Sequence, residues 1–115
     1  MKTPKIILLL LIVAATAFSF AKPLQEVTIK IASNCDHFDI CETGKMRLEK
    51  ELTLTSGIKK VSIDSKLMTV TVKYNAKRIS PDKIRKVISN AGYDADDVKA
   101  DPKGIEGLDE CCRKK

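Results

Sequence analysis

Apolar and polar residues alternate along three short segments of the chain. Val27, Ile29 and Ile31 alternate with polar neighbours, and a similar alternation runs through 68–74 and, more briefly, through 58–63. A period of two places successive side chains on opposite faces of an extended backbone, which is typical of a half-buried strand. The pattern therefore predicts three strands, each with one face toward a core.

Two other segments repeat their apolar residues every three or four positions, which is the period of a helix. The first is predicted to begin at Cys41 and to end near Gly57, a residue that accepts the left-handed conformation that closes helices. The second begins at Ser80-Pro81-Asp82. There a hydroxyl can cap the helix, proline suits the first turn and the carboxylate meets the positive helix end.

The order of these elements predicts the fold. With a short edge strand at 93–98 the order is β-α-β-β-α-β, which is the ferredoxin-like α+β arrangement, an antiparallel four-stranded sheet with two helices on one face. We expect one domain over 22–100. The predicted core consists of Ile29, Ile31, Leu48, Leu52, Val61, Ile63, Val70, Val72, Ile84, Val87 and Ile88.

The N-terminal segment 1–21 has the layout of a secretory signal peptide. Lys2 and Lys5 precede a continuous apolar run, and Ser19-Phe20-Ala21 places small residues where signal peptidase cleaves. We expect cleavage after Ala21 and a periplasmic or secreted protein. The alternative is an uncleaved anchor, although the apolar run is short for a membrane span, which needs about 20 residues.

Composition argues against several classes of function. The net charge is +6, but lysines and acidic residues are interspersed, unlike the clustered basic surface of a nucleic-acid binder. Aromatic residues make up 4% of the chain, which leaves no stacking platform for bases. A single histidine offers little for acid-base catalysis, so we do not expect an enzyme.

The residues with the clearest chemistry lie between the first strand and the first helix. Cys35, His37 and Cys41 place two of the four cysteines and the only histidine within seven positions. Thiolate and imidazole are ligands for thiophilic ions such as Cu⁺ and Zn²⁺, and Asp36 or Asp39 would add an oxygen that favours Zn²⁺. The alternative is a Cys35–Cys41 disulfide, which an exported protein permits.

A second thiol pair, Cys111-Cys112, lies near the end of the chain. We expect 101–115 to be a loosely attached tail that is hinged at Pro102 and Gly104. The alternative is a short helical turn that Ile105 and Leu108 attach to the domain. Three interpretations stay open for the pair: metal ligation, a disulfide with Cys35 or Cys41, and a vicinal disulfide. A tail of this length can bring both thiols to the first loop, so we expect them to contribute there.

Several local sequences resemble the heavy-metal-associated domain family of small copper and mercury carriers and metal-pump modules. Leu48-Glu49-Lys50-Glu51-Leu52 resembles its first-helix core pattern, and Gly57-Ile58-Lys59-Lys60-Val61 its entry to the second strand. Thr69 to Tyr74 resembles its third strand. Ile84 to Ala91, followed by Gly92-Tyr93, resembles its second helix and the turn after it. The likeness covers about 26–98 and implies the same fold.

The metal motif of this chain departs from the family pattern, Gly-Met-x-Cys-x-x-Cys. Cys41 falls on the first motif cysteine, whereas the second falls on Gly44, which has no ligand. Cys35 and His37 lie in a loop insertion. The residues themselves then suggest a replacement site of Cys35, His37 and Cys41, to which Cys111 and Cys112 would add from the tail.

The resemblance implies a protein that sequesters a thiophilic ion, Cu⁺ or Zn²⁺, or transfers it by thiolate ligand exchange. The expected partners are the metal ion and a metal-transporting membrane protein, with the chain itself a monomer that binds neither nucleic acid nor, after cleavage, a membrane. Two alternatives remain. One is a thiol-disulfide redox protein without metal, and the other is a degenerate domain that serves as an interaction module.

Overall fold

The computed structural model describes residues 24–32, 35 and 37–112, without the side chain of Cys111. The expected signal peptide and Asp36 lie outside these residues. Within the part of the chain that is described, no helix combines the length and the apolar character needed to cross a membrane.

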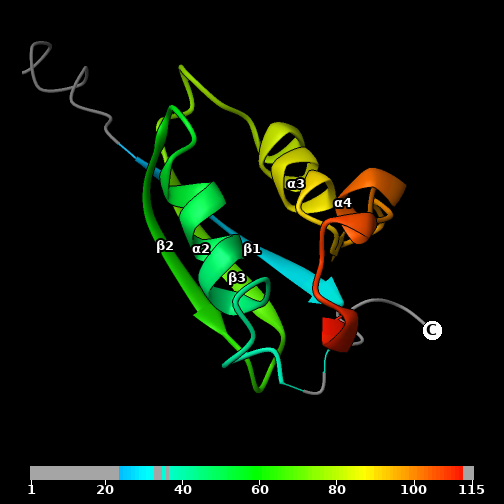
Figure 1. Cartoon of the computed structure of the whole chain (residues 1–115). Helices are drawn as coiled ribbons and strands as arrows, with labels where there is room; N and C mark the ends of the chain where they lie inside the picture. The colour runs from blue at the N-terminus through cyan, green and yellow to red at the C-terminus, as the bar shows by residue number, and fades with distance from the viewer. Residues whose placement is uncertain (1–23, 33–34, 36, 113–115) are drawn as a thin grey trace, which may run out of the picture.

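The elements follow one another in the predicted order (Figure 1). They are β1 (Gln25–Ala32), α2 (Lys45–Thr53), β2 (Ile58–Asp64), β3 (Thr69–Tyr74), α3 (Pro81–Asn90), β4 (Asp94–Ala95), α4 (Pro102–Glu106) and the 3₁₀ turn η2 (Glu110–Cys112). The four strands form one sheet in the order β2-β3-β1-β4, and each neighbouring pair is antiparallel. The predicted ferredoxin-like fold is therefore confirmed.

The register of β1 against β3 separates an apolar face from a polar one. Ile29 pairs with Val70, and both are fully buried. One position along, Thr28 pairs with Thr71, and their hydroxyl groups are hydrogen-bonded at 3.1 Å on the outer face. Because cross-strand partners point to the same side of a sheet, the alternation predicted from the sequence assigns one face to the core.

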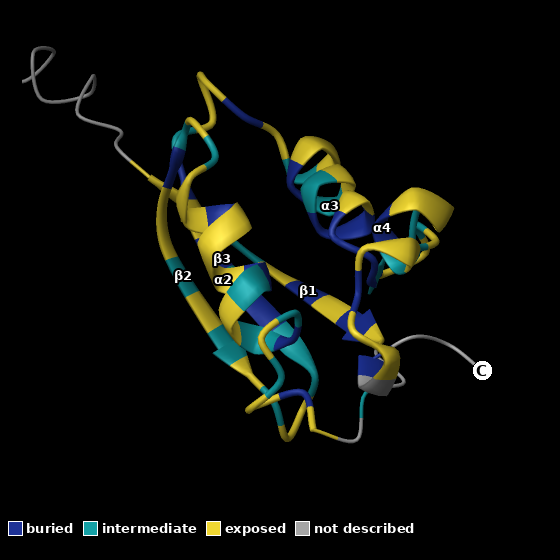
Figure 2. Ribbon diagram, in the orientation of Figure 1, coloured by how far each residue is buried: buried dark blue, intermediate teal, exposed yellow. Residues whose placement is uncertain are grey.

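The two long helices cover the apolar face of the sheet. Leu48 and Leu52 of α2 and Ile84 and Ile88 of α3 have no exposed surface. The helices also contact each other, and in Figure 2 the part of α3 that faces the sheet is dark blue whereas its outer turns are yellow. Of the predicted core residues, only Val61, Ile63 and Val87 are half-buried, and these pack against the core.

The helix boundaries were predicted with unequal success. For α3 the cap is confirmed, since the Ser80 hydroxyl accepts a hydrogen bond from the Lys83 amide at 3.3 Å. For α2 the predicted start at Cys41 is wrong, because the helix begins at Lys45 and Gly44 is its N-cap. The backbone groups just before Gly44 are used in turns instead. Gly57 adopts a φ of +95°, as its proposed closing role requires.

The C-terminal segment differs from the loosely attached tail that we expected. It forms α4 and η2, and it buries Gly104, Leu108 and Cys112 against the domain. Gly104 is therefore not a hinge but a point of close contact with the end of α3. The sequence offered Leu108 as a contact with the domain, and Leu108 is buried. The close backbone contact at Gly104 has no signal in the sequence pattern.

A buried leucine in α2 provides a test of the fold. Leu52→Ala should lower the free energy of unfolding by about 2–5 kcal/mol, because the side chain is fully buried between α2 and the sheet. Leu54→Ala is the matched control, since Leu54 follows the same helix and is 73% exposed. Denaturant unfolding followed by circular dichroism measures both, and equal losses would contradict the assigned core.

Candidate metal centre

The loop before α2 is held in place by its own backbone. The carbonyl oxygen of His37 accepts hydrogen bonds from the amides of Ile40 at 3.0 Å and of Cys41 at 2.8 Å. The Lys45 amide donates to the carbonyl oxygen of Phe38 at 2.8 Å. These bonds close successive turns, so Cys41 has a defined position although it precedes the helix.

Phe38 anchors this loop to the domain. Its side chain is 6% exposed and packs edge-to-face against Tyr93, with ring centroids 5.6 Å apart. Edge-to-face pairs at this separation add to the free energy of burial. The backbone of Phe38 also passes so close to Gly44 that a Cβ there would lie 3.1 Å from the Phe38 carbonyl carbon. The position of the missing second motif cysteine therefore has no room for a side chain.

Thr43 connects the loop to both the domain and the C-terminal segment. Its carbonyl oxygen accepts a hydrogen bond from the Tyr93 hydroxyl at 2.7 Å. Its own hydroxyl oxygen accepts one from the Asp109 amide at 2.9 Å. Burial raises the pKa of Tyr93 to about 12; the nearby Arg47 guanidinium opposes this rise and the Asp109 carboxylate adds to it. The phenol thus remains a donor to Thr43 at alkaline pH values where an ordinary tyrosine has begun to ionise.

Three cysteine sulfurs come together between the loop and the C-terminal segment. The Sγ atoms of Cys35, Cys41 and Cys112 all lie within 4.8 Å of one another. Cys112 is 2% exposed, and the other two are half-buried. Cys35 and Cys112 form a disulfide, and Cys41 is also in the disulfide-bonded state. A disulfide between the tail and the loop is one of the alternatives that the sequence left open.

We define the sulfur cluster as Cys35, Cys41 and Cys112. The side chain of His37 is exposed and is not part of the cluster. Asp39 is likewise exposed. The side chain of Cys111, like Asp36, lies outside the residues that the structure describes. The expected participation of His37 and Cys111 as ligands therefore stays a prediction.

Sequence reasoning missed two residues that support the cluster, Thr43 and Arg47. The Arg47 guanidinium donates to the Gly107 carbonyl oxygen at 3.0 Å, which ties α2 to the segment after α4. Both residues act on backbone groups far away in sequence. No local motif accompanies such contacts, so no signal in the sequence could have identified them.

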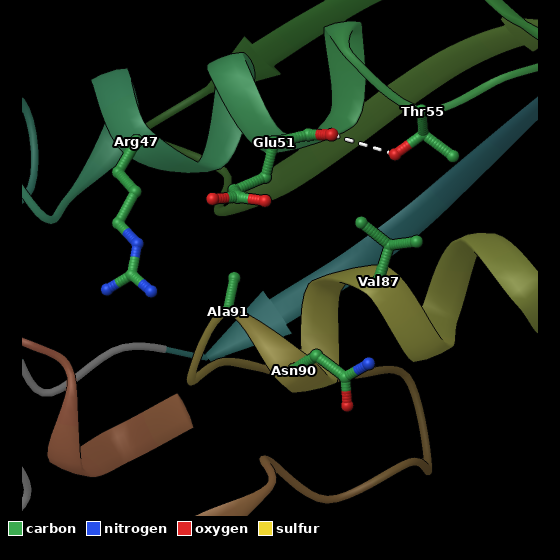
Figure 3. A pocket seen from close by; sticks show the side chains of 6 residues that line it. All are labelled: Arg47, Glu51, Thr55, Val87, Asn90 and Ala91. Atoms are coloured by element: carbon green, nitrogen blue, oxygen red, sulfur yellow. Dashed lines mark hydrogen bonds between the residues drawn. The ribbon is translucent and has the colours of Figure 1, made fainter. Parts of the chain in front are cut away.

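Arg47 also lies at one end of a groove of about 240 Å³ between α2 and α3 (Figure 3). The groove is lined by Arg47, Glu51, Thr55, Val87, Asn90 and Ala91, which include no cysteine. In Figure 3 the Arg47 side chain extends away from Glu51, toward the C-terminal segment. Its guanidinium therefore serves the contact with Gly107, and the groove is separate from the sulfur cluster.

The sequence profile of the heavy-metal-associated domain matches residues 38–94. This range runs from the anchored loop through α2, β2, β3 and α3 to the start of β4. No curated protein is significantly similar to the chain in sequence.

Solved structures of this family share the fold. Oxidised MerP from Ralstonia metallidurans CH34 superposes with a TM-score of 0.54 at 21% identity, covering 63% of this chain and 93% of MerP. A CopZ metallochaperone superposes with a TM-score of 0.51 at 18% identity, covering 62% of this chain and 98% of CopZ. A third structure is the N-terminal domain of a potential copper-translocating P-type ATPase from Bacillus subtilis in its Cu(I)-loaded state. It superposes with a TM-score of 0.53 at 25% identity, covering 64% of this chain and 85% of the ATPase domain.

The raised pKa of Tyr93 predicts how stability depends on alkaline pH. Its ordinary value is 10.0 and its folded value about 12, so the unfolded chain loses this proton first. The stabilising contribution is therefore complete below pH 10 and is lost as the pH rises toward 12. The free energy of unfolding of the wild type should fall more steeply over that interval than that of Tyr93→Phe.

The comparison of the wild type with Tyr93→Phe isolates the contribution of Tyr93 to the pH dependence, because the lysines titrate in both proteins. Tyr74→Phe leaves Tyr93 as the sole tyrosine, and the ultraviolet absorbance of its phenolate then reports the pKa directly. Identical pH profiles for the wild type and Tyr93→Phe would show that the hydroxyl is not buried in its hydrogen bond to Thr43.

Proposed function

Because the chain belongs to the heavy-metal-associated domain family, we propose that it binds a thiophilic metal ion and transfers it by thiolate ligand exchange. The observation that carries this proposal is the sulfur cluster, in which three Sγ atoms lie within 4.8 Å of one another. Once reduced, sulfurs at this separation can bind one ion together. Metal carriage of this kind requires no catalytic machinery.

The ligand set favours Cu⁺ over Zn²⁺. Thiolates are soft ligands and suit both ions. Structural Zn²⁺ sites are almost always four-coordinate, whereas the cluster supplies three sulfurs. The exposed position of His37 and Asp39 leaves the cluster without a described nitrogen or oxygen ligand. We therefore propose Cu⁺ as the cargo and Zn²⁺ as the second candidate.

Metal loading on the cluster requires reduction. In the oxidised state the sulfurs of Cys35 and Cys112 share a bond and offer no thiolate. A dithiol reductant that supplies two electrons and two protons would break this S–S bond, release the thiols of Cys35 and Cys112 and itself become a disulfide. Cys41 is also in the disulfide-bonded state, so its bond must be reduced by the same exchange, with a second dithiol, before three thiolates are available. Ion binding then displaces the thiol protons.

We also propose that the protein works outside the cytoplasm, in the periplasm or as a secreted protein. The features that support this location are the signal-peptide pattern of 1–21 and the disulfide, since disulfides persist in oxidising compartments. A membrane metal transporter is the partner that such a carrier would serve.

The disulfide itself favours a second candidate, a thiol-disulfide protein that carries electrons and no metal. That function predicts ready exchange of the Cys35–Cys112 bond with external dithiols and no metal uptake after reduction. Metal content measured by mass spectrometry, on protein purified reduced and without oxygen, separates the two candidates.

Competition titration of the reduced protein with a Cu⁺ chelator tests the proposed site. The wild type should bind one ion, and Cys41→Ser or Cys112→Ser should weaken binding by about a hundredfold or more, since even outer-shell changes cost about 10–100-fold. His37→Ala is the control, because its exposed side chain is outside the cluster.

Equal affinities in the wild type and both serine variants would rule out the cluster as the metal site. A loss of Cu⁺ affinity in His37→Ala alone would instead support the ligand set that the sequence suggested, which includes His37.

A further inference from the structure

We propose that Gly104 and Thr43 are positioning residues of the sulfur cluster, which hold Cys112 against Cys35 before any bond to sulfur forms. The consequence for metal affinity rests on the proposed function, whereas the consequence for the thiol pair does not.

Cys35 and Cys112 are 77 positions apart in sequence. A thiol on a flexible tail meets its partner at an effective concentration in the millimolar range for short linkers, and lower for long ones. A thiol on a docked segment meets its partner at a higher effective concentration, because other contacts have already compensated for the conformational entropy that the segment loses when it is ordered. The cluster therefore depends on what docks the segment.

The first docking contact is between the backbones of α4 and the end of α3. A Cβ on Gly104 would lie 2.6 Å from the Gly92 amide nitrogen, and a Cβ on Gly92 would lie 2.8 Å from the Gly104 carbonyl oxygen. Real Cβ atoms do not approach backbone atoms so closely, so the segment would have to move away. Gly92 also has a φ of +103°, which makes Gly104 the cleaner position to substitute.

Hydrogen bonds fix the start of α4 beside this contact. The Asp101 amide donates to the Ser89 carbonyl oxygen of α3 at 2.9 Å. The Asp101 side chain then caps α4 by accepting from the Lys103 amide at 2.8 Å. The direction in which the segment leaves α3 is therefore set before Gly104 is reached.

The second docking contact is at the far end of the segment. Leu108 is 3% exposed within the core cluster, and the next residue, Asp109, donates its amide to the Thr43 hydroxyl at 2.9 Å. The carbonyl oxygen of Asp109 accepts from the Cys112 amide at 2.9 Å. Thr43 thus binds the backbone turn that carries Cys112, and Thr43 itself follows Cys41 by two positions.

None of these contacts involves a sulfur atom. They join the segment to α3 at Gly104 and to the anchored loop at Thr43, so they are available in the reduced protein as well as in the oxidised one. The geometry points to a site in which packing of the C-terminal segment places Cys112 beside the loop cysteines. The disulfide, or the bound metal, then forms because the sulfurs are already close together.

The test measures the effective concentration of one thiol pair without metal. In a Cys41→Ser, Cys111→Ser background only Cys35 and Cys112 remain, and equilibration with glutathione in the presence of a chelator follows their disulfide. As the protein S–S bond forms, one oxidised glutathione is reduced to two thiols. The ratio of the disulfide and dithiol forms of the protein gives the effective concentration.

Gly104→Ala should lower this effective concentration by roughly tenfold or more, as expected when a docked thiol becomes a tethered one. Alanine is the better helix former, so the loss would reflect tertiary contact and not α4 itself. Gly107→Ala is the matched control, because its Cβ would meet nothing closer than an Arg47 guanidinium nitrogen at 3.4 Å. It should leave the value within about twofold.

Thr43→Val removes the acceptor for the Asp109 amide while it keeps the shape of the side chain, and it should also lower the effective concentration. Thermal unfolding checks each variant, and Thr43→Val decides the matter if Gly104→Ala does not fold. Values for Gly104→Ala and Thr43→Val that equal the Gly107→Ala control would overturn the positioning role.

Cu⁺ competition on the four-cysteine versions of the same variants separates the two proposals. Weaker binding in Gly104→Ala and Thr43→Val supports both. If Gly104→Ala and Thr43→Val lower the effective concentration of the Cys35 and Cys112 thiols, but neither the wild type nor the variants bind Cu⁺, the positioning role is supported and the proposed function is overturned.

Discussion

The C-terminal segment depends on a contact between two backbones that leaves no room for a side chain. Gly104 in α4 lies against Gly92 at the end of α3, and this close approach sets the path of the chain up to Cys112. Since α2 and α3 already cover the apolar face of the sheet, the described part of the segment buries only two side chains, those of Leu108 and Cys112. Backbone contact and hydrogen bonding therefore supply much of what holds it.

The part of the fold that was predicted from the sequence is the part in which side-chain burial is periodic. The alternation through Ile29 and Val70 and the caps of α3 each repeat a local rule, and the structure follows them. The start of α2 does not, because the amides of Cys41 and Lys45 bond to carbonyl groups of His37 and Phe38. The spacing of apolar residues cannot reveal such turns.

The candidate site shows the same division. Residue type alone identified the cysteines, and three of them do meet. Their pairing depends on contacts such as Asp109 with Thr43, which lie 66 positions apart and involve a backbone amide. A threonine in a loop has no feature that distinguishes this role. His37 illustrates the converse, since its chemistry suggested a ligand but its side chain is exposed.

The three cysteines are buried to unequal extents, and this difference would give the proposed transfer a direction. Cys112 is 2% exposed, whereas Cys35 and Cys41 are half-buried. For an ion held by the cluster, the thiolate of an incoming partner can approach from the side of the loop but not through the packed segment. Ligand exchange would therefore begin with the loop cysteines and end with Cys112. Under the proposed function, docking of the C-terminal segment would thus retain the ion until the partner had supplied its own ligands.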